Sequence, residues 1–224
     1  MIKVKVFAVN PFREAMYIVS DDTLECVIID CGMETPSEKK RVDGYILSKG
    51  LKPVMAINTH CHIDHILGIA ALKNTYDIPF AASFADTDLL VGAASHAAMY
   101  GMELQEELVD TIDIDLSKVE EVKFGNTTLR VIKTPGHSLG GVCFFEPESH
   151  TLFSGDTLFK GSIGRTDLPG GDYSQIMSSI LTKIVPLGKD VTIYPGHGDH
   201  TTLSDELMYN PFITDVLNGD VNYK

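Results

Sequence analysis

The sequence predicts an α/β protein in which two mixed sheets pack together with helices on the outside. Three observations lead to this fold class. Each half of the chain contains several short alternating or apolar segments, typical of strands, followed by a helical segment. The 224 residues, 44% of them hydrophobic, are enough for one well-buried domain and few for two. No repeat, low-complexity tract or linker divides the sequence, so we expect residues 1–224 to form a single domain.

The first half begins with three predicted strands, "IKVKVFAV", "AMYIVSD" and "ECVIIDCG". A helix follows, because Thr35 suits the N-cap, Pro36 suits the first turn and Gly50 suits the end. "PVMAINT" is then an apolar strand that runs directly into a histidine cluster. The rest of this half reads as the helix "HILGIAALKNTYD", the strand "IPFAAS" and the helical segment "ADTDLLVGAASHAAMYG".

The second half repeats the pattern of strands followed by a helix. Residues 102–118, which connect the halves, are acidic and weakly patterned, as in a loop over a site. Two hairpins follow, one turning at Gly125-Asn126 and the other at "PES". "YSQIMSSILTKIV" is then predicted to be a helix and "DVTIYPG" a strand, and the tail from Thr202 a short helix.

Charge and composition exclude several classes of protein. The net charge of -13 repels phosphate backbones and argues against a nucleic-acid binder. The N-terminus has no signal-peptide pattern, and no apolar run approaches a membrane span, so we expect a cytoplasmic protein without membrane contact. The cysteines lack CxxC spacing and are expected to be reduced thiols; they are Cys26, Cys31, Cys61 and Cys143.

The stretch "THCHIDH" indicates a metal site. His60 and His62 come just after a strand, and they point to one side if the extended conformation continues. Asp64 would share that side, and His65 would begin a helix. One or two histidines at a strand end are ordinary loop residues. Four candidate ligands within residues 60–65 are much harder to explain without a metal such as zinc, iron or manganese.

Three further candidate ligands lie downstream, each directly after a predicted strand and a glycine. They are His137 in "TPGHS", Asp156 in "SGDTLF" and His197 in "YPGHG". Glycine at the preceding position allows a sharp turn that directs the next side chain into a cleft. With the first cluster they make seven nitrogen or oxygen ligands, more than one tetrahedral site needs. Seven ligands suit two metals about 3.5–4 Å apart that share one carboxylate.

Cys61 lies between two histidines, and thiolate is a strong zinc ligand. Strand alternation nevertheless turns this side chain to the face opposite His60 and His62. The seven nitrogen and oxygen ligands also fill both metals without it. We therefore expect Cys61 to be a small, buried, reduced side chain behind the site.

This ordered set of motifs, "HxHxDH", "PGH", "SGD" and "PGHG", resembles the metallo-β-lactamase superfamily of hydrolases from about residue 1 to 212. The resemblance implies a four-layer αβ/βα sandwich, also classed as α+β, with the metals at one edge of the sheets. It implies that Asp156 bridges the two metals and that Asp30, in "IIDCG", orients the site without binding metal. The implied ligands are His60, His62 and His137 for the first metal and Asp64, His65 and His197 for the second.

Within this family, the wording of two segments resembles the short glyoxalase II-type thioesterases, which are hydroxyacylglutathione hydrolase-like. These segments are "SGDTLFKGSIGRTDLPGGD" and "YPGHGDHTTLSDELMYNPF". Longer relatives add a helical C-terminal domain that grips glutathione, and residues 198–224 are too few for it. True β-lactamases usually have cysteine at the position of Asp156 and lack the histidine at position 65, which disfavours antibiotic hydrolysis. The tRNA-processing members are longer and hold a polyanion, which the charge of -13 disfavours.

The implied reaction is thioester hydrolysis of a small molecule. A hydroxide that bridges two divalent metals, zinc foremost and iron or manganese otherwise, would attack the carbonyl. Asp156 would hold both metals and Asp64 would shuttle a proton, so these two are the catalytic candidates. A thiolate with a parent pKa of about 8.5 leaves unprotonated, whereas an amide nitrogen needs a general acid.

Three alternatives remain open. Persulfide dioxygenases resemble the same motifs, and there His60, His137 and Asp156 would hold a single iron as a two-histidine, one-carboxylate triad. A lactone hydrolase is the second alternative, and a non-catalytic metal-binding domain is the third. Ligand counting alone does not separate them.

Beyond the ligands, "GRTD" contains a candidate for the substrate pocket. Arg165 either meets a substrate carboxylate or forms a buried structural pair with Asp167. Tyr100, at the end of an Ala-rich helical stretch, either lines the pocket entrance or packs on the core. The remaining histidines are expected at the surface or behind the ligands; they are His96, His150 and His200.

Overall fold

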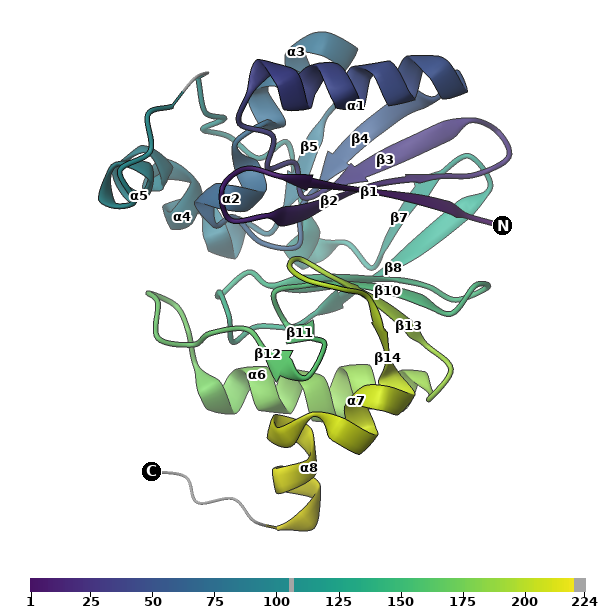
Figure 1. Cartoon of the computed structure of the whole chain (residues 1–224), viewed down its shortest axis with the longest axis vertical. Helices are drawn as coiled ribbons and strands as arrows, with labels where there is room; N and C mark the ends of the chain where they lie inside the picture. The colour runs from purple at the N-terminus through teal and green to yellow at the C-terminus, as the bar shows by residue number, and fades with distance from the viewer. Residues whose placement is uncertain (105–106, 220–224) are drawn as a thin grey trace.

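Two six-stranded sheets lie face to face, with helices on both outer sides (Figure 1). The computed structural model describes residues 1–104 and 107–219. From top to bottom, Figure 1 shows α1 and α3, the first sheet, the second sheet, and then α6 to α8. This order of layers is the αβ/βα sandwich that the sequence predicts.

The first sheet has the strand order β1-β2-β3-β4-β5-β6. Its first three strands are antiparallel, and β3 to β6 are parallel. The strands are β1 Lys3–Val9, β2 Glu14–Ser20, β3 Glu25–Ile29, β4 Lys52–Ile57, β5 Phe80–Ala82 and β6 Ile114–Asp115. The helical elements of this half are α1 Pro36–Lys49, α2 Ile63–Ile66, α3 Ile69–Tyr76, η1 Phe84–Asp86, α4 Thr87–Val91, α5 Ala93–Met99 and η2 Leu116–Lys118.

The second sheet has the order β14-β13-β10-β9-β8-β7 and is antiparallel except where β10 meets β13. Its strands are β7 Glu121–Phe124, β8 Thr127–Lys133, β9 Val142–Glu146, β10 Thr151–Gly155, β13 Thr192–Pro195 and β14 Thr201–Thr202. A small separate hairpin joins β11 Leu158–Phe159 to β12 Ser162–Ile163. The helical elements are α6 Tyr173–Ser179, η3 Ile180–Ile184, η4 Val185–Leu187, α7 Leu203–Tyr209 and α8 Pro211–Asn218.

Helix α1 has the boundaries that its sequence predicts. The Thr35 hydroxyl accepts from the Glu38 backbone N–H at 3.3 Å, and the Glu38 carboxylate accepts from the Thr35 N–H at 2.9 Å. This reciprocal capping box satisfies two donors that the first turn leaves unpaired. At the other end Gly50 takes the left-handed conformation, with φ 64°, which glycine adopts without a steric cost.

Strand alternation divides the core between the layers. In β2, Met16 and Ile18 belong to the apolar cluster that also contains Val42 and Ile46 of α1. The intervening Tyr17 and Val19 belong to the cluster between the two sheets, with residues of β8, β9 and β10. A third cluster packs the second sheet on α6, η3 and the C-terminal helices. Both faces of each sheet are therefore buried, as a four-layer arrangement requires.

Three local predictions need correction. The segment 102–118, predicted as a loop, includes strand β6 and the short helix η2, and the side chain of Val109 is buried in the core. The helix predicted over 65–77 is two helices, and the first, α2, begins at Ile63. The tail from Thr202 forms two helices rather than one. Within the part of the chain that the structure describes, we find no helix with the length and apolarity that a membrane crossing requires.

Candidate metal centre

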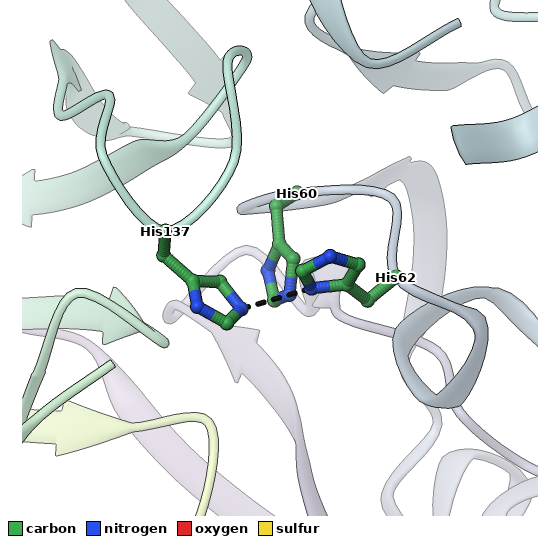
Figure 2. Close-up of side chains that lie close together, drawn as sticks. All are labelled: His60, His62 and His137. Carbon is green, nitrogen blue, oxygen red and sulfur yellow. Dashed lines mark hydrogen bonds between the residues drawn. The ribbon is translucent and has the colours of Figure 1, made fainter. Parts of the chain in front are cut away.

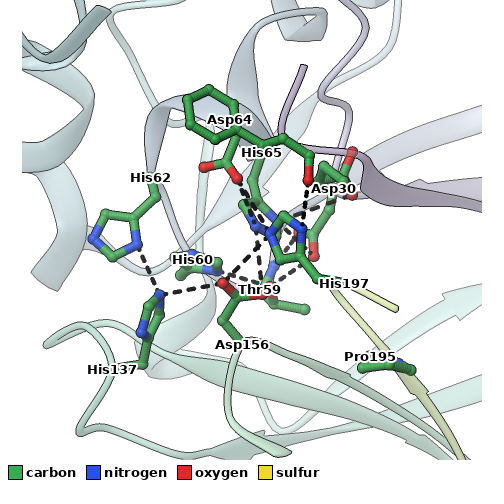
Figure 3. Close-up of polar contacts among 12 residues, drawn as sticks. Asp30, Thr59, His60, His62, Asp64, His65, His137, Asp156, Pro195 and His197 are labelled. Carbon is green, nitrogen blue, oxygen red and sulfur yellow. Dashed lines mark hydrogen bonds and ion pairs between the residues drawn. The ribbon is translucent and has the colours of Figure 1, made fainter. Parts of the chain in front are cut away.

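The seven predicted ligands converge at one edge of the two sheets (Figure 3). The stretch after β4 contributes four of them. His60 and His62 lie between β4 and α2, where His62 has extended backbone, whereas Asp64 and His65 lie in α2. Asp64 was expected in extended backbone, but α2 begins at Ile63 and includes it. The other three follow β8, β10 and β13 of the second sheet; they are His137, Asp156 and His197.

Three imidazoles form the first group (Figure 2). The ring centroids of His60, His62 and His137 lie 4.6–4.8 Å apart, and the rings are nearly perpendicular in each pair. His62 Nδ1 and His137 Nε2 point at each other at 2.9 Å. One ring nitrogen from each residue lies within 4.8 Å of the others, so all three can reach one ion.

The second group consists of Asp64, His65 and His197. Asp64 Oδ2 lies 3.2 Å from His197 Nε2 and 3.8 Å from His65 Nε2. These atoms also lie within 4.8 Å of one another. They form a second set that can reach one ion.

Asp156 lies between the two groups. Its Oδ1 is 3.5 Å from His65 Nε2, and its Oδ2 is 3.5 Å from His137 Nε2 and 3.6 Å from His197 Nε2. The carboxylate therefore faces both the first group and the second (Figure 3). No other carboxylate among the described residues belongs to a ligand set containing His60.

The donor atoms fit divalent metal. Among the described residues, the buried ligand atoms without a hydrogen-bond partner include His60 Nε2, His65 Nε2 and Asp156 Oδ1. Leaving such an atom buried and unpaired costs about 1–3 kcal/mol. A divalent ion satisfies imidazole nitrogens and carboxylate oxygens in this arrangement, and zinc, iron and manganese all accept this donor set.

The electrostatics of the cluster keep His60 and His62 neutral. Burial and the neighbouring imidazoles lower the pKa of His60 well below its usual value. Burial, with His137 next, lowers the pKa of His62 to about 3. Neutral imidazole has the free lone pair that a metal needs.

In the second group the charges support one another. Burial opposes ionisation of Asp64 and Asp156, but His65 and His197 together outweigh it and lower the pKa of both carboxyl groups. Burial also opposes protonation of His65, but the charges of Asp64 and Asp156 raise its pKa well above the usual value. Without metal, this group is held by carboxylate–imidazolium attraction, and a divalent cation replaces the positive charge.

Asp30 lies directly behind the ligands. Its two carboxylate oxygens accept from the Thr59 backbone N–H and the Thr59 hydroxyl, both at 2.7 Å. Oδ2 also lies 3.3 Å from His65 Nδ1, and the Thr59 hydroxyl lies 3.1 Å from His60 Nδ1. Asp30 therefore orients two ligand rings by their far nitrogens, the geometry expected of a residue that supports a metal site.

Two buried carboxylates near the cluster received no role in the sequence analysis. Asp86 accepts from Cys61 N, Ser138 Oγ and Gly140 N, so it ties the first histidine segment to the loop of His137. Glu14 is fully buried, with Oε1 4.0 Å from His65 Nδ1, and burial raises the pKa of its carboxyl group. Both act on residues distant in sequence, so no local motif marks them.

Cys61 is buried among core side chains, as expected of a residue behind the site. Its thiol belongs to none of the candidate ligand groups among the described residues. Burial, together with the charge of Asp86, raises the pKa of this thiol well above its usual value. The protonated thiol is a poor metal ligand, because the thiolate is the form that binds.

The three glycines before the downstream ligands serve different purposes. Gly136 and Gly155 have φ 135° and 50°, conformations that a side chain disfavours. A Cβ on Gly136 would collide with the backbone nitrogen of Ile176, and one on Gly155 with Thr59 Oγ1. Gly196 has no positive φ, but a Cβ there would collide with Asp156 Oδ1. A sharp turn was expected at all three positions. At Gly196 the glycine is instead required by close packing.

The start of β2 holds the loop of His197. Ala15 N donates to the Gly196 carbonyl at 2.8 Å, and Glu14 pairs with His197 in an isolated β-bridge. The Tyr17 hydroxyl donates to the Pro195 carbonyl at 2.6 Å. The last ligand in the sequence is thus positioned by a strand of the opposite sheet.

A cavity of about 620 Å³ opens onto the ligand cluster. Tyr100 lines it, as one of the two readings of that residue predicts, and His96 also lies on its wall. Arg165 lines it too, and forms two 2.8 Å contacts with the carboxylate of Asp167. The Arg–Asp pair forms as one reading expects, but it is exposed rather than buried, with side-chain exposures of 56% and 69%.

The other two histidines lie away from the ligand groups. His150 Nδ1 contacts the Asp190 carboxylate at 2.6 Å on the surface. The ring of His200 stacks on Tyr194, with centroids 5.8 Å apart. Neither belongs to a ligand set among the described residues, which agrees with the sequence analysis.

The chain is similar to several known proteins along nearly its whole length. Hydroxyacylglutathione hydrolase GloC of Haemophilus influenzae is 31% identical over 213 residues, 95% of this chain and 98% of the relative. The crystal structure of the BLEG-1 B3 metallo-β-lactamase superposes with a TM-score of 0.85 and 32% identity, covering 95% of this chain and all of that one. The structure of TTHA1623 in a di-iron-bound form gives a TM-score of 0.82 and 32% identity, covering 93% of this chain and all of that one.

These similarities agree with the layers and the ligand cluster. Residues 9–197, which contain all seven candidate ligands, match the model of the Metallo-beta-lactamase superfamily. The chain belongs to the metallo-β-lactamase superfamily.

Proposed function

We propose that this protein is a metal-dependent hydrolase of small thioesters, of the hydroxyacylglutathione hydrolase type, with two divalent ions at the seven-ligand cluster. The observation that carries the proposal is the position of Asp156, whose two oxygens face the first and the second ligand group. The similarity to GloC supports the thioester as substrate class.

The chemistry follows from the residues around the cavity. Divalent ions held here would lower the pKa of bound water to about 7 and polarise a carbonyl oxygen. Asp64 faces the cavity, and its Oδ2 lies 3.2 Å from His197 Nε2, so it can accept a proton beside the reacting atoms. A thiolate leaves unprotonated, which suits a site without a dedicated acid besides its ligands.

We propose zinc as the metal, with iron or manganese as alternatives. All three accept imidazole and carboxylate ligands. The relative TTHA1623 has a structure in a di-iron-bound form, which supports iron as the leading alternative. We also propose a cytoplasmic location, which the four buried, free cysteines support.

Metal content measured together with turnover tests the proposal. We expect two equivalents of zinc, iron or manganese per chain, and hydrolysis of S-lactoylglutathione or of a matched thioester with another thiol. One equivalent of iron with oxygen uptake on glutathione persulfide would instead identify a dioxygenase. Failure to turn over any thioester, lactone or persulfide would favour a non-catalytic metal-binding domain.

β-Lactam hydrolysis is a second candidate, because BLEG-1 carries the name of a B3 metallo-β-lactamase. An amide leaving group needs a general acid, whereas a thiolate leaves unprotonated. We therefore expect kcat/KM for a thioester to exceed that for a cephalosporin. The reverse order would transfer the assignment to β-lactam hydrolysis.

A further inference from the structure

The wall of the cavity is mainly apolar once the ligands are set aside. It is built from both halves of the chain, so it continues across the junction between the two sheets. The first half contributes Phe12, Ile63, Leu89, Met99 and Tyr100, and the second half contributes Phe159, Ile163, Leu168 and Pro169.

Two aromatic side chains form one side of this wall. The rings of Phe12 and Tyr100 meet edge to face, with centroids 5.4 Å apart. Their exposed fractions are 37% and 52%, so each keeps a large surface free for a ligand. Phe159 also makes an edge contact with the ring of His197, with centroids 6.2 Å apart. An apolar surface this close to reactive ligands is typical of a substrate site.

The cavity offers little compensation for charge. Among the described residues that line it, Arg165 is the only lysine or arginine. Both its Nε and its Nη2 already donate to the carboxylate of Asp167. A glutathione conjugate carries two carboxylates and an ammonium group, and each needs a partner when it leaves water. An apolar substituent needs none.

We propose that the cavity binds an apolar substituent of aromatic size, so that the preferred substrate is a thioester with such a group beside the scissile bond. This inference rests on the proposed thioester hydrolysis and refines its substrate class. Four lining residues determine the specificity: Phe12, Tyr100, Phe159 and Leu168. Glutathione is then an accepted carrier rather than the group that the cavity recognises.

Two matched pairs of thioesters locate the substituent. In the first pair the thiol is always glutathione, and the acyl group is lactoyl or phenylacetyl. In the second pair the acyl group is always lactoyl, and the thiol is glutathione or benzyl mercaptan. We expect the aromatic member of at least one pair to have a kcat/KM about tenfold higher, the usual effect of extra apolar groups in a fitting pocket. The pair that shows the preference identifies which side of the thioester enters the cavity. Equal values in both pairs would overturn the inference and leave the thioesterase assignment intact.

Substitutions on the wall test the residues themselves. Phe12→Ser and Tyr100→Ser alter partly exposed side chains, so we expect both variants to fold. Each should reduce the preference for the aromatic substrate by about tenfold, mainly through KM, because a surface that contacts bound substrate is lost. Leu217→Ser is the matched control, since Leu217 is 59% exposed on α8 and does not line the cavity. An unchanged preference in both wall variants would contradict the assignment.

Binding of carboxylic acids gives a readout that does not need turnover. Calorimetric titration of the metal-loaded protein with phenylacetate and with acetate compares an aromatic with a minimal acid. We expect phenylacetate to bind about tenfold more tightly and Tyr100→Ser to remove the difference. If no thioester is cleaved, the proposed function fails, whereas this result would still establish the apolar cavity. Equal affinities for the two acids would overturn the inference.

Discussion

The two halves of the molecule supply the metal centre in different ways. The first half contributes four ligands from residues 60–65, within one loop and the start of one short helix. The second half contributes three ligands that follow β8, β10 and β13, strands that lie in one sheet. The first set is brought together by local geometry, and the second by strand pairing. One side of the metal site is therefore formed by local geometry, and the other depends wholly on the sheet.

The supports of the two sets differ as well. Behind the first set, Asp30 holds Thr59 by two hydrogen bonds; the Thr59 hydroxyl contacts His60 Nδ1, and Asp30 Oδ2 contacts His65 Nδ1. Before each ligand of the second set, a glycine lets the backbone approach its neighbours closely. One side is therefore vulnerable to loss of a polar group and the other to the addition of a methyl group.

The largest expected effect comes from removing Asp156, the member of the second set that faces both ligand groups. Asp156→Ala should lose both metals or reduce kcat by more than about 100-fold, the upper range for residues that only support a ligand. Metal analysis and steady-state kinetics measure the two effects. Asp190→Ala, a change at an exposed surface carboxylate in the same half, is the control. Full activity in Asp156→Ala would rule out the two-metal arrangement.

A methyl group at Gly136 should destabilise the second set. Gly136→Ala imposes a disfavoured φ of 135° and a collision with Ile176, so we expect a loss of about 3 kcal/mol in the free energy of unfolding. In the first half, Gly44 lies in α1, and a Cβ there meets nothing within 4 Å. Gly44→Ala should therefore stabilise the protein by about 1 kcal/mol. Urea unfolding measures the stability of both variants. Equal changes in the free energy of unfolding would contradict the expected difference between Gly136 and Gly44.

Removing the charge behind the first set should weaken metal binding without removing a ligand. Asp30 has φ 54°, which asparagine tolerates, so Asp30→Asn changes the charge and keeps the backbone. We expect metal affinity to fall by about 10- to 100-fold. Competition with a chromogenic chelator measures it, with the exposed Asp22→Asn as control. An unchanged affinity would show that Asp30 does not orient the ligands.

Asp21, which is distant in the sequence from every ligand, also joins the two halves. Its carboxylate accepts from Asn126 N at 2.6 Å and from the Thr127 hydroxyl at 3.1 Å, besides Thr23. Burial opposes its ionisation, but these hydrogen bonds outweigh it and lower the pKa of Asp21. The stabilisation is therefore fully present above the unfolded pKa of about 3.9 and is lost as the pH falls through the folded value.

We expect Asp21→Asn to cost about 2 kcal/mol in the free energy of unfolding at pH 7. The difference from the parent protein should shrink as the pH falls below about 4 and through the lowered folded pKa of Asp21, because the parent carboxyl group is then protonated as well. Urea unfolding at pH 7 and pH 3 measures it. A difference that does not depend on pH would mean that the carboxylate charge has no part in joining the halves.

The smallest effect is expected at Cys61. Cys61→Ala removes one buried sulfur, so we expect a loss of about 1 kcal/mol in stability. Metal content and affinity should not change, because the thiol is not a ligand. Loss of metal by a variant whose circular dichroism is unaltered would place Cys61 in the first ligand set.

Much of the fold follows from local rules. Thr35, Pro36 and Gly50 define α1 because capping and termination depend on residues within one turn. The layers follow from alternation, which places Met16 and Tyr17 of β2 on opposite faces. The metal cluster was predictable because four candidate ligands lie within residues 60–65 and the other three each follow an apolar strand.

Other features depend on contacts that no short segment contains. Asp86 lies in a stretch that reads as helical, yet its role comes from Ser138 and Gly140, more than 50 residues away. Strand β6 forms from an acidic, weakly patterned segment because its backbone pairs with β5. In both places the structure is determined by tertiary hydrogen bonds, and local propensity does not indicate it.

The hydrogen bonds between β2 and the loop of His197 affect the order of folding. The hydrogen bond from Tyr17 to Pro195 joins residues 178 positions apart in the chain, so it closes one of the longest loops in the molecule. Contacts of such long range carry a large entropic cost and form late in most small proteins. Four ligands can be in place beforehand, but the complete centre exists only after the two sheets have docked. The uptake of the full metal complement during refolding would therefore mark the final step of assembly.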